Sequence, residues 1–122
     1  MNREGKHYFE YTRVSTEMQV EGYSLEGQEN CIKKYADREE MICVGKYKDA
    51  GKSGKSIEGR PDFKRMLKDI QNGTKVDFVI VYKLSRFGRN AADILNSLEL
   101  IQSYGVELIC VEEGIDSSQT SG

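Results

Sequence analysis

The sequence is poor in the residues that build cross-links and metal sites. Its 122 residues include one histidine, one proline, three cysteines and no tryptophan. Because Cys31, Cys43 and Cys110 are odd in number and never stand at C-x-x-C spacing, we expect buried free thiols and neither a disulfide nor a zinc site. His7 would have to be the only base of a Ser-His-Asp triad, and a single histidine disfavours most metal sites, so no metal is expected.

Long hydrophobic runs are also missing. No apolar stretch approaches the ~20 residues that a membrane-spanning helix needs, and the polar start MNREGKH lacks the apolar segment of a secretory signal. The length suits one domain that can bury a core without cross-links. We therefore expect a single cytoplasmic domain that does not associate with membranes.

The net charge of −2 gives no general affinity for nucleic acids, but the positive charges are unevenly distributed. One basic segment, residues 46–60, contains Lys46, Lys48, Lys52, Lys55 and Arg60 against Asp49 and Glu58. A second, residues 83–89, contains Lys83, Arg86 and Arg89 and no acidic residue. A charged run is most often only a solvated face. Two such segments become informative if the fold brings them together.

The hydrophobic pattern alternates between strands and helices. Strands are predicted at residues 7–14, 41–47, 76–82 and 106–111, and helices at residues 24–40, 61–71 and 91–104. Pro61 suits the first turn of a helix, and Asn90 followed by Asp93 is a weak capping box. The run VDFVIVY is apolar almost throughout, as in a central parallel strand covered on both faces. Residues 49–60 are predicted to form a glycine-rich loop, and residues 112–122 a polar tail.

This order predicts an α/β fold with three layers: a mostly parallel central sheet of about four strands with helices on both faces. In such sheets ligands bind beyond the carboxyl ends of the strands. The loops after the first three strands emerge at that edge, so both basic segments should meet there beside Ser15. Tyr11, Arg13 and Ser15 share a face if the first strand stays extended. A hydroxyl beside a guanidinium makes Ser15 a candidate nucleophile toward an anion.

Five motifs occur in an order that resembles a known family. They are YTRVST (11–16), SLEGQ (24–28), YKDAGKSG (47–54), EGRPDF (58–63) and KLSRFGRN (83–90). Together they resemble the catalytic domain of the serine recombinases, the resolvase/invertase family, over nearly the whole chain from Tyr8 onward. The stretch VEGYSLEGQ (20–28) is more similar to the large serine recombinases, which are phage integrases and transposon recombinases. The resemblance implies a resolvase-like fold.

The resemblance also implies site-specific DNA recombination. Ser15 would attack a DNA phosphodiester and become linked to the 5′ phosphate, leaving a free 3′ hydroxyl, with double-stranded DNA as the partner and no cofactor. The family works as dimers that synapse into tetramers. The residues that match family active-site positions are Arg13, Arg86 and Arg89 around the scissile phosphate, the further arginine Arg60, and the polar residues Gln19, Gln28 and Asp49. Because the loop of Arg86 is polar, we expect this side chain to be exposed and its replacement by alanine to leave the fold intact.

The sequence departs from the family pattern at two places. Ser85 stands where many members have an acidic residue just before the first arginine of the last motif. A hydroxyl there keeps part of the hydrogen bonding of a carboxylate but not its charge. The chain also stops at Gly122, before the long pairing helix and the DNA-binding domains of the family. We therefore interpret residues 1–122 as the catalytic-domain fragment of a longer protein and expect a monomer or weak dimer.

Two other functions remain open on the sequence alone. GKSGKS (51–56) is similar to the end of a P-loop, but the glycine required five residues earlier is replaced by Lys46 for Gly51 and by Asp49 for Gly54. Stabilisation by ATP or GTP with magnesium would support this nucleotide site. A non-enzymatic, receiver-like regulatory or interaction module would need an acidic cluster at the end of the first strand, and residues 11–16 contain none. Activity retained after Ser15→Ala would favour that module.

Overall fold

The computed structural model describes residues 3–14, 25–50, 60–88 and 90–119. Its sheet has the strand order β2-β1-β3-β4-β5. The strands are β1 (His7–Val14), β2 (Ile42–Ala50), β3 (Phe78–Val81), β4 (Glu107–Cys110) and β5 (Ile115–Asp116). β1 pairs in parallel with β2 and β3, and β3 pairs in parallel with β4, whereas β5 runs antiparallel to β4. The predicted α/β fold with a mostly parallel sheet is confirmed, with one short strand more than expected.

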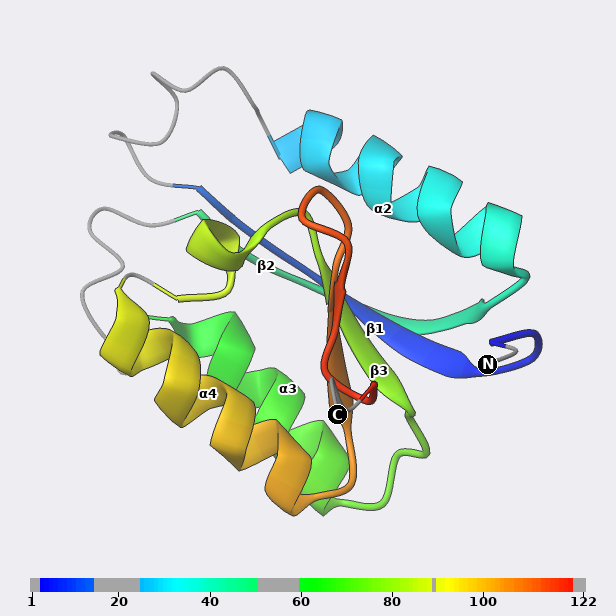
Figure 1. Ribbon diagram of the computed structural model, residues 1–122. Helices are drawn as coiled ribbons and strands as arrows, with labels where there is room; N and C mark the ends of the chain where they lie inside the picture. Colours follow the sequence, from blue (N-terminus) through cyan, green and yellow to red (C-terminus); the bar gives the residue numbers. More distant parts are fainter. Residues whose placement is uncertain (1–2, 15–24, 51–59, 89, 120–122) are drawn as a thin grey trace.

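Helices cover both faces of the sheet (Figure 1). α2 (Leu25–Glu39) lies on one face, and α3 (Pro61–Gln71) and α4 (Ala91–Ser103) lie on the other. The alternation of side chains along β1 divides the core between the two faces. Tyr8 packs with Ile32 of α2, whereas Phe9 and Tyr11 belong to the cluster that contains Phe63 of α3. Burial of apolar side chains on both faces is the main force that holds the layers together.

Local signals explain where the helices begin and end. Pro61 occupies the first turn of α3, where its missing N–H is not needed. The side chain of Asn90 caps α4 by accepting from the N–H of Asp93 at 2.9 Å. Gly73 and Gly105 follow the ends of α3 and α4 with φ angles of 102° and 81°, a conformation that favours glycine. The predicted starts of both helices are confirmed.

Three expectations about the edges of the sheet are wrong. β2 continues to Ala50, so Asp49 lies in a strand, in register with Arg13, and not in a loop. Part of the predicted tail forms β5, whose two residues are too few to produce an alternating pattern. Cys110 is buried, but Cys31 is half-buried and Cys43 is exposed, because α2 packs on β1 and β3 while β2 is an edge strand. All three thiols are free.

The connection from β3 to α4 carries the second basic segment. It contains the short 3₁₀ helix η2 (Leu84–Arg86). The N–H of Arg86 donates to the Lys83 carbonyl and the N–H of Phe87 donates to the Leu84 carbonyl, each at 2.9 Å. Within the described ranges, no helix is long and apolar enough to cross a membrane.

Candidate active site

The candidate site lies at the carboxyl edge of the sheet, where β1, β2 and β3 end. β1 and β2 place Arg13 and Asp49 next to each other in register. Nη2 of Arg13 donates to the carbonyl of Ser85 at 2.8 Å and to that of Gly88 at 3.2 Å, so the end of β1 contacts the segment that holds Arg86. The fold brings together the five predicted site residues that the structure describes, which are Arg13, Gln28, Asp49, Arg60 and Arg86. The predicted site residues Ser15, Gln19 and Arg89 lie outside the described residues, as does the GKSGKS segment (51–56).

Gln28 of α2 holds the end of β1. Its side chain is fully buried and pairs with both backbone groups of Arg13. The Arg13 N–H donates to Oε1 of Gln28 at 3.4 Å, and Nε2 of Gln28 donates to the Arg13 carbonyl at 3.2 Å. The side-chain amide therefore acts like a short piece of neighbouring strand, and it fixes the backbone two residues before Ser15 in the sequence.

Arg60 is enclosed by the protein. It directly precedes α3, and its side chain is fully buried. Nη1 donates to the carbonyl of Phe87 and, at 3.5 Å, to the hydroxyl of Tyr11, while Nη2 donates to Oγ of Ser97 at 3.0 Å. The guanidinium also lies 4.5 Å from the centroid of the Phe63 ring. These contacts explain how an arginine that the sequence placed at the end of a loop can be buried.

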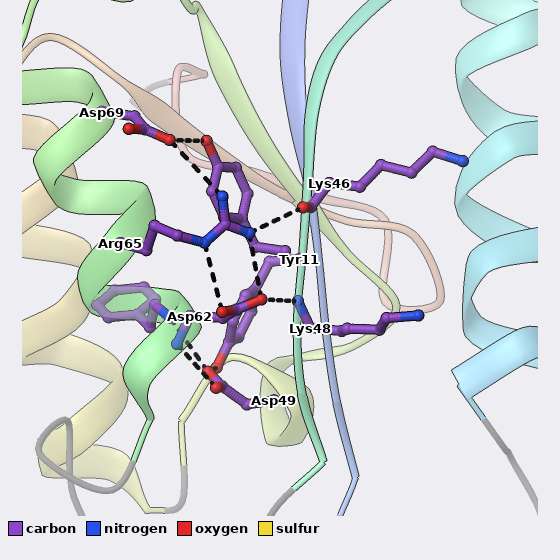
Figure 2. Close-up of polar contacts among 9 residues, drawn as sticks. Tyr11, Lys46, Lys48, Asp49, Asp62, Arg65 and Asp69 are labelled. Atoms are coloured by element: carbon purple, nitrogen blue, oxygen red, sulfur yellow. Dashed lines mark hydrogen bonds and ion pairs between the residues drawn. The ribbon is translucent and has the colours of Figure 1, made fainter.

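Asp49 caps α3 from a neighbouring strand (Figure 2). Its carboxylate accepts from the backbone N–H groups of Asp62 at 2.9 Å and Phe63 at 3.1 Å, and from the Tyr11 hydroxyl at 2.8 Å. A carboxylate at a helix N-terminus satisfies unpaired N–H groups and interacts favourably with the helix dipole. Burial raises the pKa of Tyr11, and the nearby Asp49 adds to that increase although Arg60 opposes it, so the hydroxyl stays protonated and donates.

A second set of contacts ties α3 to β2 (Figure 2). Asp62 accepts from the backbone N–H of Lys48 at 2.9 Å. The guanidinium of Arg65 stacks 4.3 Å from the centroid of the Tyr47 ring and pairs with Asp62 at 3.3 Å. Burial alone would raise the pKa of Asp62, but the hydrogen bonds from Arg65 and from the Lys48 N–H lower it below its usual value. These contacts fix the helix that begins directly after Arg60.

Arg86 is fully buried in η2, so the expectation that its polar loop exposes it is wrong. The turn of residues 84–88 packs against both α3 and α4. Phe87 packs edge-on against Phe63 with ring centroids 5.8 Å apart, and a Cβ at Gly88 would stand 2.9 Å from the backbone nitrogen of Ile94. Replacing Arg86 by alanine would empty a buried position, and we no longer expect such a variant to keep the stability of the fold.

Positive charge dominates the buried part of the site. Arg13, Arg60 and Arg86 are 3%, 0% and 0% exposed. Among the described residues, neither Arg13 nor Arg60 forms an ion pair with a carboxylate, and the buried carboxylate of Asp49 is bonded to α3 and Tyr11. Burial lowers the pKa of Arg13, and the positive charges of Arg60 and Arg86 add to this decrease, although Tyr11 and Asp93 oppose it. Because buried charges normally require a partner, this arrangement is suited to binding an anion such as a phosphate.

Sequence reasoning missed Ser97 and the carbonyls of the turn. Ser97 stands on α4 at helical spacing between Ile94 and Ile101, which pack in the core. A hydroxyl within an apolar helix stripe is the signal that could have identified it. Ser85 is exposed and contributes its backbone carbonyl to Arg13, a contact that leaves no trace in the sequence. In the parts of the chain that are described, no group of three or more His, Cys, Asp or Glu side chains could hold a metal ion.

The sequence matches a known family over almost its whole length. Residues 8–122 match the family described as Resolvase, N terminal domain. The DNA-invertase BinR of transposon Tn552 from Staphylococcus aureus is 31% identical over 114 residues, which cover 92% of this chain and 52% of the invertase. The resolvase of transposon Tn2501 from Escherichia coli is 39% identical over 64 residues, which cover 52% of this chain and 31% of the resolvase. The matches thus span about half or less of these curated relatives.

Two solved structures have a similar fold. A resolvase family site-specific recombinase from Streptococcus pneumoniae is 57% identical with a TM-score of 0.81, and the match covers 95% of this chain and 78% of that one. The N-terminal catalytic domain of TP901-1 integrase is 36% identical with a TM-score of 0.84, and the match covers 96% of this chain and 85% of that one. These structures confirm the resolvase-like α/β fold.

Proposed function

This chain belongs to the family of resolvase N-terminal domains, and on that premise we propose that it cleaves and rejoins DNA at specific sites through a covalent bond between Ser15 and a DNA 5′ phosphate. The observation that supports the proposal most directly is the buried group of guanidiniums at the carboxyl edge. Two of them, on Arg13 and Arg60, have no carboxylate partner among the described residues. Ser15 follows Arg13 by two residues in the sequence.

In the proposed reaction, the Ser15 oxygen attacks the scissile phosphorus in line with the departing 3′ oxygen. The serine O–P bond forms as the bond from phosphorus to the 3′ oxygen breaks. The serine hydroxyl loses its proton, and the 3′ oxygen takes up a proton to become a free hydroxyl. Because one phosphodiester is exchanged for another, a 3′ hydroxyl from a different strand end can reverse the step and complete rejoining.

Arginines suit this chemistry because the phosphate oxygens carry the charge that must be stabilised in the transition state. Arg13, Arg86 and Arg89 are proposed to surround the scissile phosphate, since a guanidinium fork matches a pair of phosphate oxygens. Polar residues are proposed to support them. They are Gln28, through the Arg13 backbone; Asp49 and Arg60, through the helix and the turn that they hold; and Gln19, from the segment between β1 and α2.

Residues 1–122 are also proposed to act within a longer protein, because the aligned regions cover only 52% of the BinR invertase and 31% of the Tn2501 resolvase. A long helix that pairs subunits and a DNA-binding region would follow this domain. The whole protein would bind double-stranded recombination sites as a dimer and pair two sites in a tetramer. The 122-residue chain alone would be a monomer or weak dimer, and sedimentation as a stable tetramer would contradict this.

A denaturing gel tests the proposed chemistry. The chain, joined to its natural C-terminal continuation, is incubated with its recombination-site DNA in EDTA. We expect a protein–DNA adduct with the wild type and with Ser103→Ala, and no adduct with Ser15→Ala. Ser103 is a matched control because it is an exposed serine at the end of α4, bonded to the Leu100 carbonyl at 2.6 Å. DNA binding without an adduct, or an adduct that persists in Ser15→Ala, would contradict the proposal.

A further inference from the structure

We infer that Ser97 is a positioning residue of the active site, because through Arg60 it holds the turn that carries Arg86. The inference rests on the proposed recombinase function. Ser97 is fully buried in the middle of α4, and its Oγ accepts from Nη2 of Arg60 at 3.0 Å. The residue lies outside the five motifs that carry the family resemblance.

The Arg60 guanidinium joins α4 to the turn after η2. While Nη2 is bonded to Ser97, Nη1 donates to the carbonyl of Phe87. The group is also stacked 4.5 Å from the centroid of the Phe63 ring. Because a guanidinium is planar and rigid, fixing one terminal nitrogen sets the direction of the other. Ser97 therefore determines where Arg60 can hold the Phe87 carbonyl.

That carbonyl belongs to the turn that sets the position of Arg86. Arg13 donates to the carbonyls of Ser85 and Gly88 at 2.8 and 3.2 Å, and Arg60 donates to a carbonyl between them. Two guanidiniums thus hold the backbone of residues 85–88 through three of its carbonyls. Arg86 lies inside this segment, so losing the bond at the next residue would loosen the backbone from which its side chain extends.

The hydroxyl of Ser97 is not required for packing or for helix formation. Ser97 lies between Ile94 and Ile101 on the buried side of α4, where alanine would have a higher helix propensity and would bury no polar atom. What the hydroxyl adds is an acceptor for a buried charged donor. Since both terminal nitrogens of Arg60 are already bonded to groups of the protein, its influence on the reaction passes through the turn.

Variants at position 97 test this role in the adduct assay. Ser97→Ala and Ser97→Cys remove a strong acceptor, Ser97→Thr keeps one, and Ser103→Ala is the control on the same helix. At saturating DNA we expect the Ala and Cys variants to form the adduct about 10- to 100-fold more slowly, the loss typical of a small displacement of a reacting group. The DNA concentration for half-saturation should not change, and the Thr variant should restore the rate. Thermal unfolding of each variant shows how much protein is folded.

A double-mutant cycle and NMR identify the route of the effect. Lysine at position 60 has a single nitrogen and cannot bridge Ser97 and Phe87, so adding Ser97→Ala to Arg60→Lys should slow the reaction little further. In the 122-residue chain, Ser97→Ala should shift the amide signals of Phe87 and Gly88, whereas Ser103→Ala should not.

Three results would overturn the role of Ser97. The first is a wild-type rate in Ser97→Ala, and the second is a rate loss from Ser97→Ala that is as large in Arg60→Lys as in the wild type. The third is unchanged amide signals of Phe87 and Gly88 in Ser97→Ala. Failure of the wild-type protein to form an adduct would instead overturn the proposed function. The NMR comparison does not depend on activity, and it would still decide whether Ser97 holds the turn.

Discussion

Asp49→Ala removes a carboxylate that accepts hydrogen bonds from three donors. The donors are the N–H of Asp62 at 2.9 Å, the N–H of Phe63 at 3.1 Å and the hydroxyl of Tyr11 at 2.8 Å. Asp49 is only 5% exposed, so water has little access to replace the lost acceptor. The variant leaves the first turn of α3 without its cap and a buried tyrosine without its acceptor.

The loss of stability has two sources, which are the missing cap of α3 and the missing acceptor of the Tyr11 hydroxyl. Removing the cap of a helix N-terminus costs about 0.5–2 kcal/mol, and removing a charged acceptor from a buried donor costs roughly 1.5–3 kcal/mol. Together they predict a loss of about 2–5 kcal/mol. That is a large part of the ~5–15 kcal/mol by which natural domains are usually stable. Asp49→Asn keeps one carbonyl oxygen and should lie between the wild type and Asp49→Ala.

Urea unfolding followed by far-UV circular dichroism measures this loss from the shift in midpoint at constant m-value. Asp37→Ala is the matched control, because Asp37 is exposed on α2 and pairs with Lys33 at 3.2 Å on the surface. It should change the free energy of unfolding by less than ~0.5 kcal/mol. A change equally small in Asp49→Ala would refute the assignment of Asp49 as the cap of α3.

Two further predictions concern Gly88 and Glu10. Gly88→Ala should lower the free energy of unfolding by about 1–3 kcal/mol, because its Cβ would lie 2.8 Å from Cγ1 of Ile94; an unchanged melting temperature would contradict this contact. Glu10 is 2% exposed, and burial raises the pKa of its carboxyl group. Ionisation is then easier in the unfolded chain, so stability should fall as pH rises from the ordinary glutamate pKa of ~4.3 through the raised value. Glu10→Gln should remove this fall and raise the melting temperature at neutral pH, and identical pH profiles for the two proteins would refute the argument.

The order of the elements could be predicted because its signals are local. The apolar run at 76–82 contains β3, Pro61 opens α3, and Asn90 caps α4, and each of these signals lies within a few residues of the structure it specifies. From the alternation of strands and helices, general rules of α/β folds then placed Arg13 and the basic turn at one edge. β5 was not predicted, because its two residues are too few to show a periodic pattern.

The burial of the site could not be predicted, because it depends on contacts between distant segments. Arginines are rarely fully buried, so the sequence favoured an exposed position for Arg86 and placed Arg60 at the end of a loop. Arg60 is buried because Ser97 and the Phe87 carbonyl, both far away in the chain, accept its hydrogen bonds. The sequence predicted that Asp49 lies in a loop. In the structure, β1 pairs with β2, and this pairing places Asp49 against the start of α3. Only the folded chain brings these donors and acceptors together.

The most direct test of the central claim is mass spectrometry of the protein after reaction with its recombination-site DNA. The adduct is digested with nuclease and protease, and the peptide that contains Ser15 is sequenced by fragmentation. We predict a nucleotide joined through its 5′ phosphate to the Ser15 oxygen, with a free 3′ hydroxyl on the complementary DNA product. A nucleotide on another side chain, such as that of Ser85, or DNA cleavage with Ser15 unmodified would contradict the account.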